Sequence, residues 1–265
     1  MPASDDRDSA ARELSTLSHG EAPAHPTAKM ALYIQSLWRY PVKSLGGEPL
    51  TTATLGMDGI TGDRIVRVRG PEGIRTARRH YRLIGLRATL DPNGRPLIDG
   101  LPWDSAEALA LIKSAAGSDA WLEAWDGLDR FDILPVLVAT DGAVAVFGHD
   151  VRRLRPNIVV RGVEGLAERD WPGGELQIGE AILRLDSLRS RCHMTTIDPD
   201  TLQVDPNVLR GIVTRFGNKL ALNAEVIRGG RIRVGDPARQ SSSSSPSAAS
   251  SARREHSASG DSSKV

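Results

Sequence analysis

The chain has a single cysteine among its 265 residues, Cys192, and therefore forms no internal disulfide. One thiolate also excludes a self-contained iron–sulfur cluster or a cysteine-rich zinc module, because both need several thiolates from one chain. Lys and Arg total 34 against 33 Asp and Glu, a formal net charge of +1, which argues against coating nucleic acid or an anionic membrane. No run approaches the roughly 20 apolar residues that cross a bilayer, so no membrane partner is predicted.

The two ends of the chain have the composition of disordered tails. Residues 1–29 are rich in Ser, Ala, Asp and Pro with almost no large apolar side chain, and residues 238–265 are rich in Ser. Such segments bury too little apolar surface to offset the entropy lost on ordering. The first thirty residues also lack the basic-then-apolar layout of a signal peptide, so we expect a cytoplasmic protein.

The core between the tails is predicted to be mainly β with a few helices. Turn residues bound many short apolar runs, which favours antiparallel barrels over βαβ crossovers. Helices are expected from a cap at Ser105 to Ala116 and from Pro206 to Phe216. Because the first helix follows a run of strands, we place a domain boundary near residue 110, between two β-barrel-like units at 30–110 and 111–237. The expected strands are 32–40, 51–55, 65–69, 133–140, 143–147, 158–162, 181–185, 220–227 and 232–234.

The surroundings of Cys192 suggest chemistry. A lone cysteine is most often a small buried apolar residue. Here Arg189 and Arg191 precede it, and nearby cations favour the thiolate, which is both the nucleophile and the soft metal ligand. His193 follows directly, but adjacent residues of a strand point to opposite faces, which disfavours a Cys–His–Asp hydrolase.

Three further segments place cations beside turns. They are K-S at Lys43-Ser44 before two glycines, G-D-R ending at Arg64, and R-R-L-R-P-N, which contains Arg155 and Asn157. Each has a purely structural interpretation: Lys43 as an exposed lysine, G-D-R as a turn with a salt bridge, and R-R-L-R-P-N as a solvated rim. Each also suits anion capture, since the guanidinium fork binds phosphate or carboxylate at two points. The K-S pair lacks the G-x-x-x-x-G-K-S/T spacing, so we reject a nucleotide-binding P-loop.

Taken in order, YPVKS, GDR, LRPNIVV, SRCHMTTIDPDT and IRVGDP resemble the motifs of MOSC-domain proteins with an N-terminal MOSC β-barrel domain. The resemblance covers residues 31–237 and is greatest to the amidoxime-reducing components and their bacterial relatives. It implies a pyranopterin molybdenum cofactor (molybdopterin with Mo), with Cys192 as the metal ligand and catalytic residue. The cofactor-binding residues that it implies are Lys43, Ser44, Arg64, Arg155, Asn157, Ser190, Arg191 and Cys192.

The resemblance further implies reduction of N-hydroxylated compounds (amidoximes, hydroxylamines, N-hydroxylated bases), with electrons from a separate flavin or iron–sulfur protein. The sequence departs from the family pattern at two places: Leu202 stands where the family often has Gly after D-P-D-T, and Ile133–Pro135 replaces a hydroxyl-bearing stretch, which predicts a less polar pocket there. Two alternatives stay open, a molybdenum-cofactor or sulfur carrier using Cys192 and a non-catalytic anion-binding β-barrel module. The basic cluster at 75–82 has too few aromatics to predict RNA binding.

Overall fold

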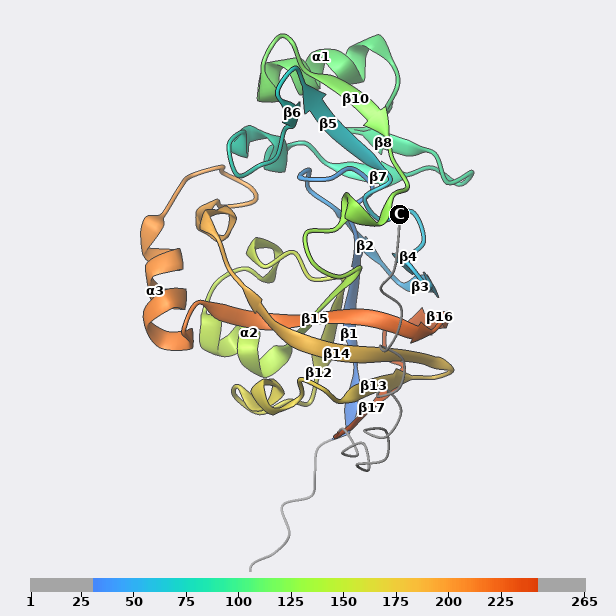
Figure 1. Cartoon of the computed structure of the whole chain (residues 1–265), viewed down its shortest axis with the longest axis vertical. Helices are drawn as coiled ribbons and strands as arrows, with labels where there is room; N and C mark the ends of the chain where they lie inside the picture. The colour runs from blue at the N-terminus through green and yellow to red at the C-terminus, as the bar shows by residue number, and fades with distance from the viewer. Residues whose placement is uncertain (1–30, 243–265) are drawn as a thin grey trace, which may run out of the picture.

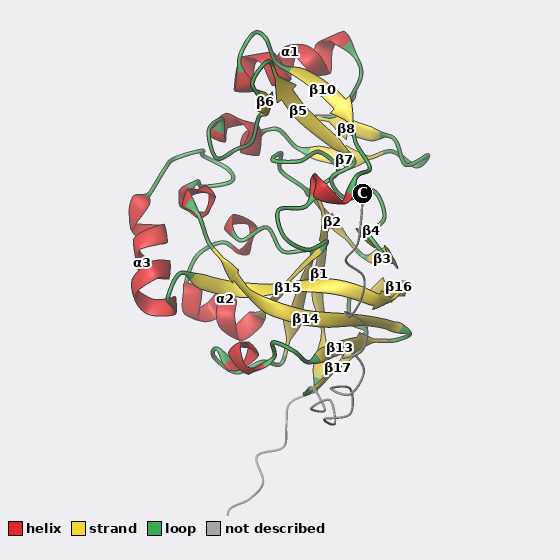
Figure 2. Cartoon of the chain, viewed as in Figure 1, coloured by secondary structure: helices red, strands yellow, loops and turns green. Residues whose placement is uncertain are grey.

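The computed structural model describes residues 31–242, so the predicted tail 1–29 and most of the tail 238–265 lie outside the described residues. The described part is mainly β with three α-helices, which confirms the predicted fold class (Figure 2). The helices are α1 (Ala106–Ala116), α2 (Asp141–Phe147) and α3 (Pro206–Phe216). Short 3-10 helices are η1 (Tyr81–Gly85), η2 (Leu128–Arg130), η3 (Val151–Arg153), η4 (Ala167–Asp170) and η5 (His193–Thr196). None of the helices in residues 31–242 is long and apolar enough to cross a membrane.

Seven strands close into a barrel, in the order β1, β12, β11, β15, β14, β13 and β17, because β1 pairs with both β12 and β17. The long strands β14 and β15 run side by side across it (Figure 1). Buried Leu183 and Leu185 alternate with exposed Arg184 and Asp186 along β14, as expected where one face of a strand meets the core. The barrel strands are β1 (Leu32–Arg39), β11 (Val136–Thr140), β12 (Ile158–Arg161), β13 (Glu175–Ile178), β14 (Ala181–Ser190), β15 (Lys219–Arg228) and β17 (Pro237–Ser241).

Short strands outside the barrel build the rest of the molecule. β10 and β6 flank β5, and this sheet shares a hydrophobic cluster with helix α1, which includes Val66, Val68 and Ile112. The packing of this unit therefore continues to the end of β10, beyond the predicted boundary near residue 110. The short strands are β2 (Glu48–Leu50), β3 (Thr52–Gly56), β4 (Gly59–Ile60), β5 (Val66–Gly70), β6 (Gly73–Ile74), β7 (Ala88–Leu90), β8 (Pro96–Ile98), β9 (Leu101–Pro102), β10 (Trp121–Ala124) and β16 (Gly230–Arg233).

Both predicted helices form where their caps lie. Ser105 Oγ accepts from Ala108 N at the start of α1 (3.1 Å), and Gly117 follows its last residue. Asp205 caps α3, and left-handed Gly217 ends it. These local signals satisfy backbone groups that a helix leaves unpaired at its ends, which is why they could be identified in the sequence.

Two expectations about secondary structure are wrong. Residues 143–147, predicted as a strand, belong to helix α2, because Thr140 Oγ1 accepts from Ala143 N and left-handed Gly148 ends the helix. This helix buries Ala143 and Phe147, which are four residues apart on one face. The second error is at the C-terminal end, where residues 238–241 belong to strand β17 rather than to a tail. Pairing with β1 and β13 supplies order that their composition does not.

Buried Glu168 next to the start of α2 makes stability depend on pH. Its side chain is fully buried, Oε1 has no hydrogen-bond partner in the described part of the chain, and Oε2 accepts from Thr140 Oγ1 at 3.3 Å. Burial raises the pKa of Glu168, so the folded chain holds this proton to a higher pH than the unfolded chain. The stability that depends on this proton is therefore lost as pH rises through the raised pKa.

Glu168→Gln is accordingly expected to raise the melting temperature at pH 8 by about 2–4 °C, the equivalent of 1 kcal/mol at this chain length. At pH 4 the gain should be much smaller, because the native carboxyl is then already neutral. Thermal unfolding at both pH values measures this, with exposed Glu164→Gln as the control. Equal gains at the two pH values would contradict the proposed titration.

Candidate functional site

A cavity of about 390 Å³ is lined by residues from both parts of the molecule. All eight residues singled out from the sequence lie in its lining, although up to 149 positions separate them along the chain. Lys43, Ser44 and Arg64 come from loops beside the N-terminal strands, and the others follow η3 or end β14. The structure thus brings together Lys43, Ser44, Arg64, Arg155, Asn157, Ser190, Arg191 and Cys192.

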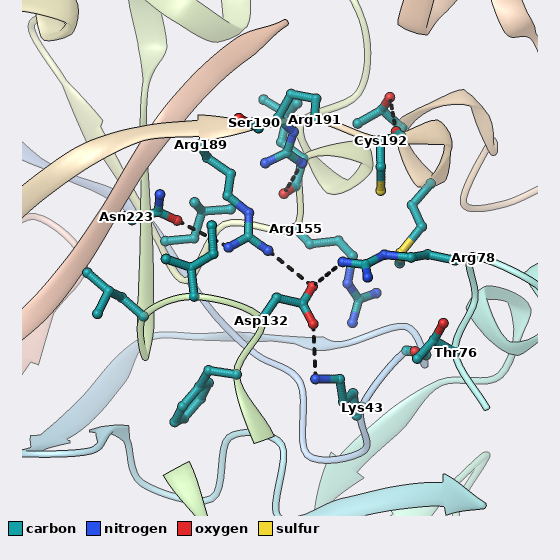
Figure 3. A pocket seen from close by; sticks show the side chains of 18 of the residues that line it. Lys43, Thr76, Arg78, Asp132, Arg155, Arg189, Ser190, Arg191, Cys192 and Asn223 are labelled. Atoms are coloured by element: carbon teal, nitrogen blue, oxygen red, sulfur yellow. Dashed lines mark hydrogen bonds and ion pairs between the residues drawn. The ribbon is translucent and has the colours of Figure 1, made fainter. Parts of the chain in front are cut away.

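Cys192 lies just after β14 and directly before η5, with a half-buried side chain that lines the cavity (Figure 3). Thr195 holds its backbone, because Thr195 N (3.0 Å) and Oγ1 (2.9 Å) both donate to the Cys192 carbonyl. His193 is exposed, and its Nε2 contacts the carbonyl oxygen of Arg78. The imidazole is therefore engaged away from the thiol, which disfavours a Cys–His hydrolase as predicted, although the reason differs: β14 ends at Ser190, so Cys192 and His193 are not strand neighbours.

Two arginines that share the cavity with the thiol have buried nitrogen atoms without partners among the described residues, Nη2 of Arg155 and Nε of Arg191. Arg191 Nη2 donates to the Leu154 carbonyl at 2.7 Å, and the Arg155 guanidinium lies 4.2 Å from the ring centroid of Tyr40. Burial lowers the pKa of each arginine to about 10, so both remain cations at neutral pH. A buried cation without a full set of partners is costly, and an anionic ligand would lower that cost.

The backbone is strained where three of the cations and donors enter the cavity. Ser44, Arg64 and Arg155 have φ angles of 77°, 55° and 56°, in the left-handed region that costs a non-glycine residue about 1–2 kcal/mol. Strain of this kind persists where tertiary structure over-determines it and is concentrated at functional sites. Leu202, in the family's frequent glycine position, also has a positive φ of 59°, which explains why glycine suits that position.

Asp63 connects the loops that carry the cations. Its carboxylate is fully buried and accepts from Tyr40 N (2.7 Å), from Arg64 Nη1 and from Asn157 Nδ2 (3.2 Å). The G-D-R turn is therefore a turn with a salt bridge, and Arg64 in it also lines the cavity. One carboxylate thus holds the end of β1, the G-D-R turn and the R-P-N segment in one arrangement.

The amide of Asn157 is fully used within the protein. Oδ1 accepts from Leu137 N (3.1 Å), and Nδ2 donates to the Trp38 carbonyl (3.3 Å) as well as to Asp63. These bonds give Asn157 a positioning role between β1 and β11. A direct contact with a cofactor stays a prediction for this residue.

A second group of cations in the cavity surrounds Asp132 (Figure 3). Lys43 Nζ lies 3.0 Å from Oδ1, while Arg78 Nη2 and Arg189 Nη2 lie 2.9 Å and 3.1 Å from Oδ2. Burial alone would raise the pKa of Asp132, but the cations prevail and lower it to about 2. We name Lys43, Arg78 and Arg189 the cation cage.

The sequence did not indicate Asp132, because an isolated aspartate in a loop carries no signal. Arg78 was visible only within the basic cluster 75–82, and the structure divides that cluster. Arg75 pairs with Asp119 at 2.6 Å, whereas Arg78 faces the cavity. Whether an arginine of this cluster belongs to the site therefore depends on the side of the loop on which its side chain lies.

The fold and the site together define a class of protein. Its members are mainly β, with a closed barrel and a cation-lined cavity that contains one thiol. The family of this chain follows from comparison. The family model of the MOSC N-terminal beta barrel domain matches residues 31–133, and that of the MOSC domain matches residues 140–239. The chain belongs to the MOSC-domain proteins with this N-terminal domain, as the resemblance predicted.

Curated relatives include human mitochondrial amidoxime-reducing component 1, which is 26% identical over 81% of this chain and 86% of the human protein. Mitochondrial amidoxime reducing component 2 of Macaca fascicularis is 26% identical over 65% of this chain and 68% of its own length. Among solved structures, the YUAD protein of Bacillus subtilis has a TM-score of 0.44 and 13% identity, covering 79% of this chain and 94% of that protein.

Proposed function

We propose that this chain is a molybdenum-cofactor-binding oxidoreductase that reduces N-hydroxylated compounds with electrons from a separate flavin or iron–sulfur protein. The observation that carries the proposal is the lone thiol sharing one cavity with two arginines that each have a buried nitrogen atom without a partner in residues 31–242. The printed names of the relatives, amidoxime-reducing components, support the choice of reaction.

The residues of the cavity fit the chemistry of this cofactor. Its phosphate and polar pterin need cations and donors, which Arg155 Nη2 and Arg191 Nε supply as unpartnered atoms. Because the pterin itself would supply sulfur ligands to the metal, the single thiolate of Cys192 would suffice from the protein. When bound, the cofactor supplies the two-electron chemistry that takes an N-hydroxyl compound, two electrons and two protons to the parent nitrogen compound and water.

The chain's own residues then have definite tasks. Arg155 and Arg191 would neutralise the anionic end of the cofactor, and Cys192 would hold the metal. Asp63 holds three cavity-forming segments in place before any ligand enters, which reduces the reorganisation that binding requires. Since the one cysteine of this chain builds no iron–sulfur cluster, a partner protein is the proposed source of electrons.

The proposal is tested on protein purified from a host that makes the cofactor. We expect near-stoichiometric molybdenum and pterin, together with conversion of benzamidoxime to benzamidine when reduced methyl viologen supplies electrons. Stoichiometric molybdenum without turnover would favour the carrier function, and metal-free protein from a competent host would favour the anion-binding module. Either result would refute the reductase.

Arg155→Lys should weaken retention of the cofactor by about tenfold, because lysine keeps the charge but loses the planar fork and its stacking on Tyr40. Molybdenum per protein after extensive dialysis measures this. Exposed Arg161→Lys, which also lies over a tyrosine ring, is the matched control. Equal molybdenum in the two variants would remove Arg155 from the proposed cofactor site.

A further inference from the structure

We propose that the cation cage of Lys43, Arg78 and Arg189 is a binding site for an anionic group of the substrate, a carboxylate or a phosphate, which Asp132 occupies in its absence. This inference rests on the proposed function and narrows it, and it gives Lys43, for which the family resemblance implies a cofactor contact, a role toward the substrate instead. The preferred substrates would be N-hydroxylated compounds that carry a negative charge some distance from the N–O bond.

The geometry around Asp132 is that of a bound carboxylate. One oxygen contacts an ammonium at 3.0 Å, and the other contacts two guanidinium groups at 2.9 Å and 3.1 Å. Within residues 31–242, all hydrogen-bond and ion-pair partners of this carboxylate are these three side chains. A carboxylate or phosphate from outside would make the same contacts, so Asp132 marks where an external anion fits.

The position of Asp132 suits a displaceable occupant. It lies in the loop between η2 and β11, and its side chain is 34% exposed, next to Ile133 at 53%. Arg189, in contrast, is held from the barrel, because its Nη1 donates to Oδ1 of buried Asn223 on β15 at 3.2 Å. The cage is therefore anchored on the barrel side, while its internal anion comes from a loop at the surface.

The charges of the cavity exceed what one cofactor would neutralise. Seven cations line it, and three of the carboxylates that pair with them are Asp63, Asp132 and Asp198. Seven cations less three carboxylates and the Cys192 thiolate that the proposed function requires leaves an excess of three positive charges, whereas a phosphate monoester carries about two negative charges. The remaining field favours a second anion over a neutral ligand. The lining cations are Lys43, Arg64, Arg78, Arg153, Arg155, Arg189 and Arg191.

Two matched substrates and three variants test the inference in the cofactor-loaded protein. The substrates are benzamidoxime and 4-carboxybenzamidoxime, which differ by one carboxylate. Arg189→Gln should lower the ratio of kcat/KM for the charged over the neutral substrate by about tenfold, the effect of one lost charge-assisted hydrogen bond. Asp132→Asn should raise this ratio several-fold, because it weakens the internal competitor. Exposed Arg79→Gln outside the cavity is the control and should leave the ratio unchanged.

A binding measurement separates this inference from the reductase proposal. Calorimetry with 4-carboxybenzamidine and benzamidine, the corresponding amidines, reports affinity without turnover. Tighter binding of the charged amidine, weakened in Arg189→Gln and strengthened in Asp132→Asn, would support the anion site even if no reduction occurred. If benzamidoxime is reduced but the charged and neutral ligands behave alike in all variants, the inference is overturned while the reductase stands.

Molybdenum content distinguishes the two possible sources of the anion. Unchanged molybdenum in Arg189→Gln, together with the lowered ratio, would assign the cage to the substrate. Loss of molybdenum from this variant would assign the cage to the cofactor's own phosphate and overturn the inference. Weaker binding of the charged amidine in Asp132→Asn would also overturn it, since Asp132 would then support the site rather than occupy it.

Discussion

Replacement of Cys192 by alanine is expected to lower benzamidoxime reduction by at least about a hundredfold, since changes to residues that merely support a metal ligand already cost up to that much. The thiol is the one sulfur lining the cavity, among the described residues, that can bind a metal as an anion, because the other, in Met194, is a neutral thioether. Its removal should also reduce the molybdenum retained after dialysis. Turnover and metal content, measured on the same preparation, check both effects.

The fold should survive this change, because Thr195 bonds to the backbone carbonyl of Cys192 and not to its sulfur. Melting temperatures of the two proteins verify this. Cys192→Ser is the matched variant, which keeps the size of the side chain but replaces the soft sulfur by a harder oxygen. Full reductase activity in either variant would eliminate Cys192 as ligand and with it the proposed mechanism.

Asp63→Ala is expected to destabilise the protein by about 3–5 kcal/mol, the cost of removing one partner from a buried ion pair. The substitution leaves Arg64, Asn157 and the backbone N–H of Tyr40 without their shared acceptor. Because these groups belong to three segments that shape the cavity, molybdenum content should fall as well. Urea unfolding followed by circular dichroism gives the change in free energy.

Two variants control the Asp63 experiment. Asp63→Asn keeps an oxygen for Tyr40 N but removes the charge opposite Arg64, so its loss of stability should be intermediate. Exposed Asp170→Ala should have almost no effect. A loss below about 1 kcal/mol in Asp63→Ala would show that packing and the other hydrogen bonds between the three segments, such as Trp38 N to Asn157 O, hold them together without Asp63.

The site exists only where the two parts of the chain meet. Lys43, Arg64 and Arg78 come from loops of the N-terminal part, while Arg189 and Cys192 lie at and beyond the end of β14. Neither part by itself contains both the thiol and the full set of cations. Any variant that loosens the contact between the two parts should therefore lower ligand affinity even where the barrel stays folded.

Much of the candidate site was visible in the sequence because its signals are local. The arginines that favour a thiolate at Cys192 lie within a few residues of it. The turns that mark Arg64 and Arg155 as candidate anion-binding residues are also their sequence neighbours. The caps of α1 and α3 are equally local. The roles of the predicted residues as cofactor contacts stay predictions, although the structure shows that all of them line one cavity.

The sequence by itself determined the mainly β class, the family motifs and the residues that converge on the cavity. Tertiary structure alone decided that β1 closes the barrel, that residues 238–241 form β17 and that Asp132 enters the cation cage. The physical reason is the distance along the chain between interacting groups. A cap or turn is read from neighbouring residues, but the pairing of β1 with β17 and of Asp132 with Lys43 depends on contacts between residues 89 or more positions apart.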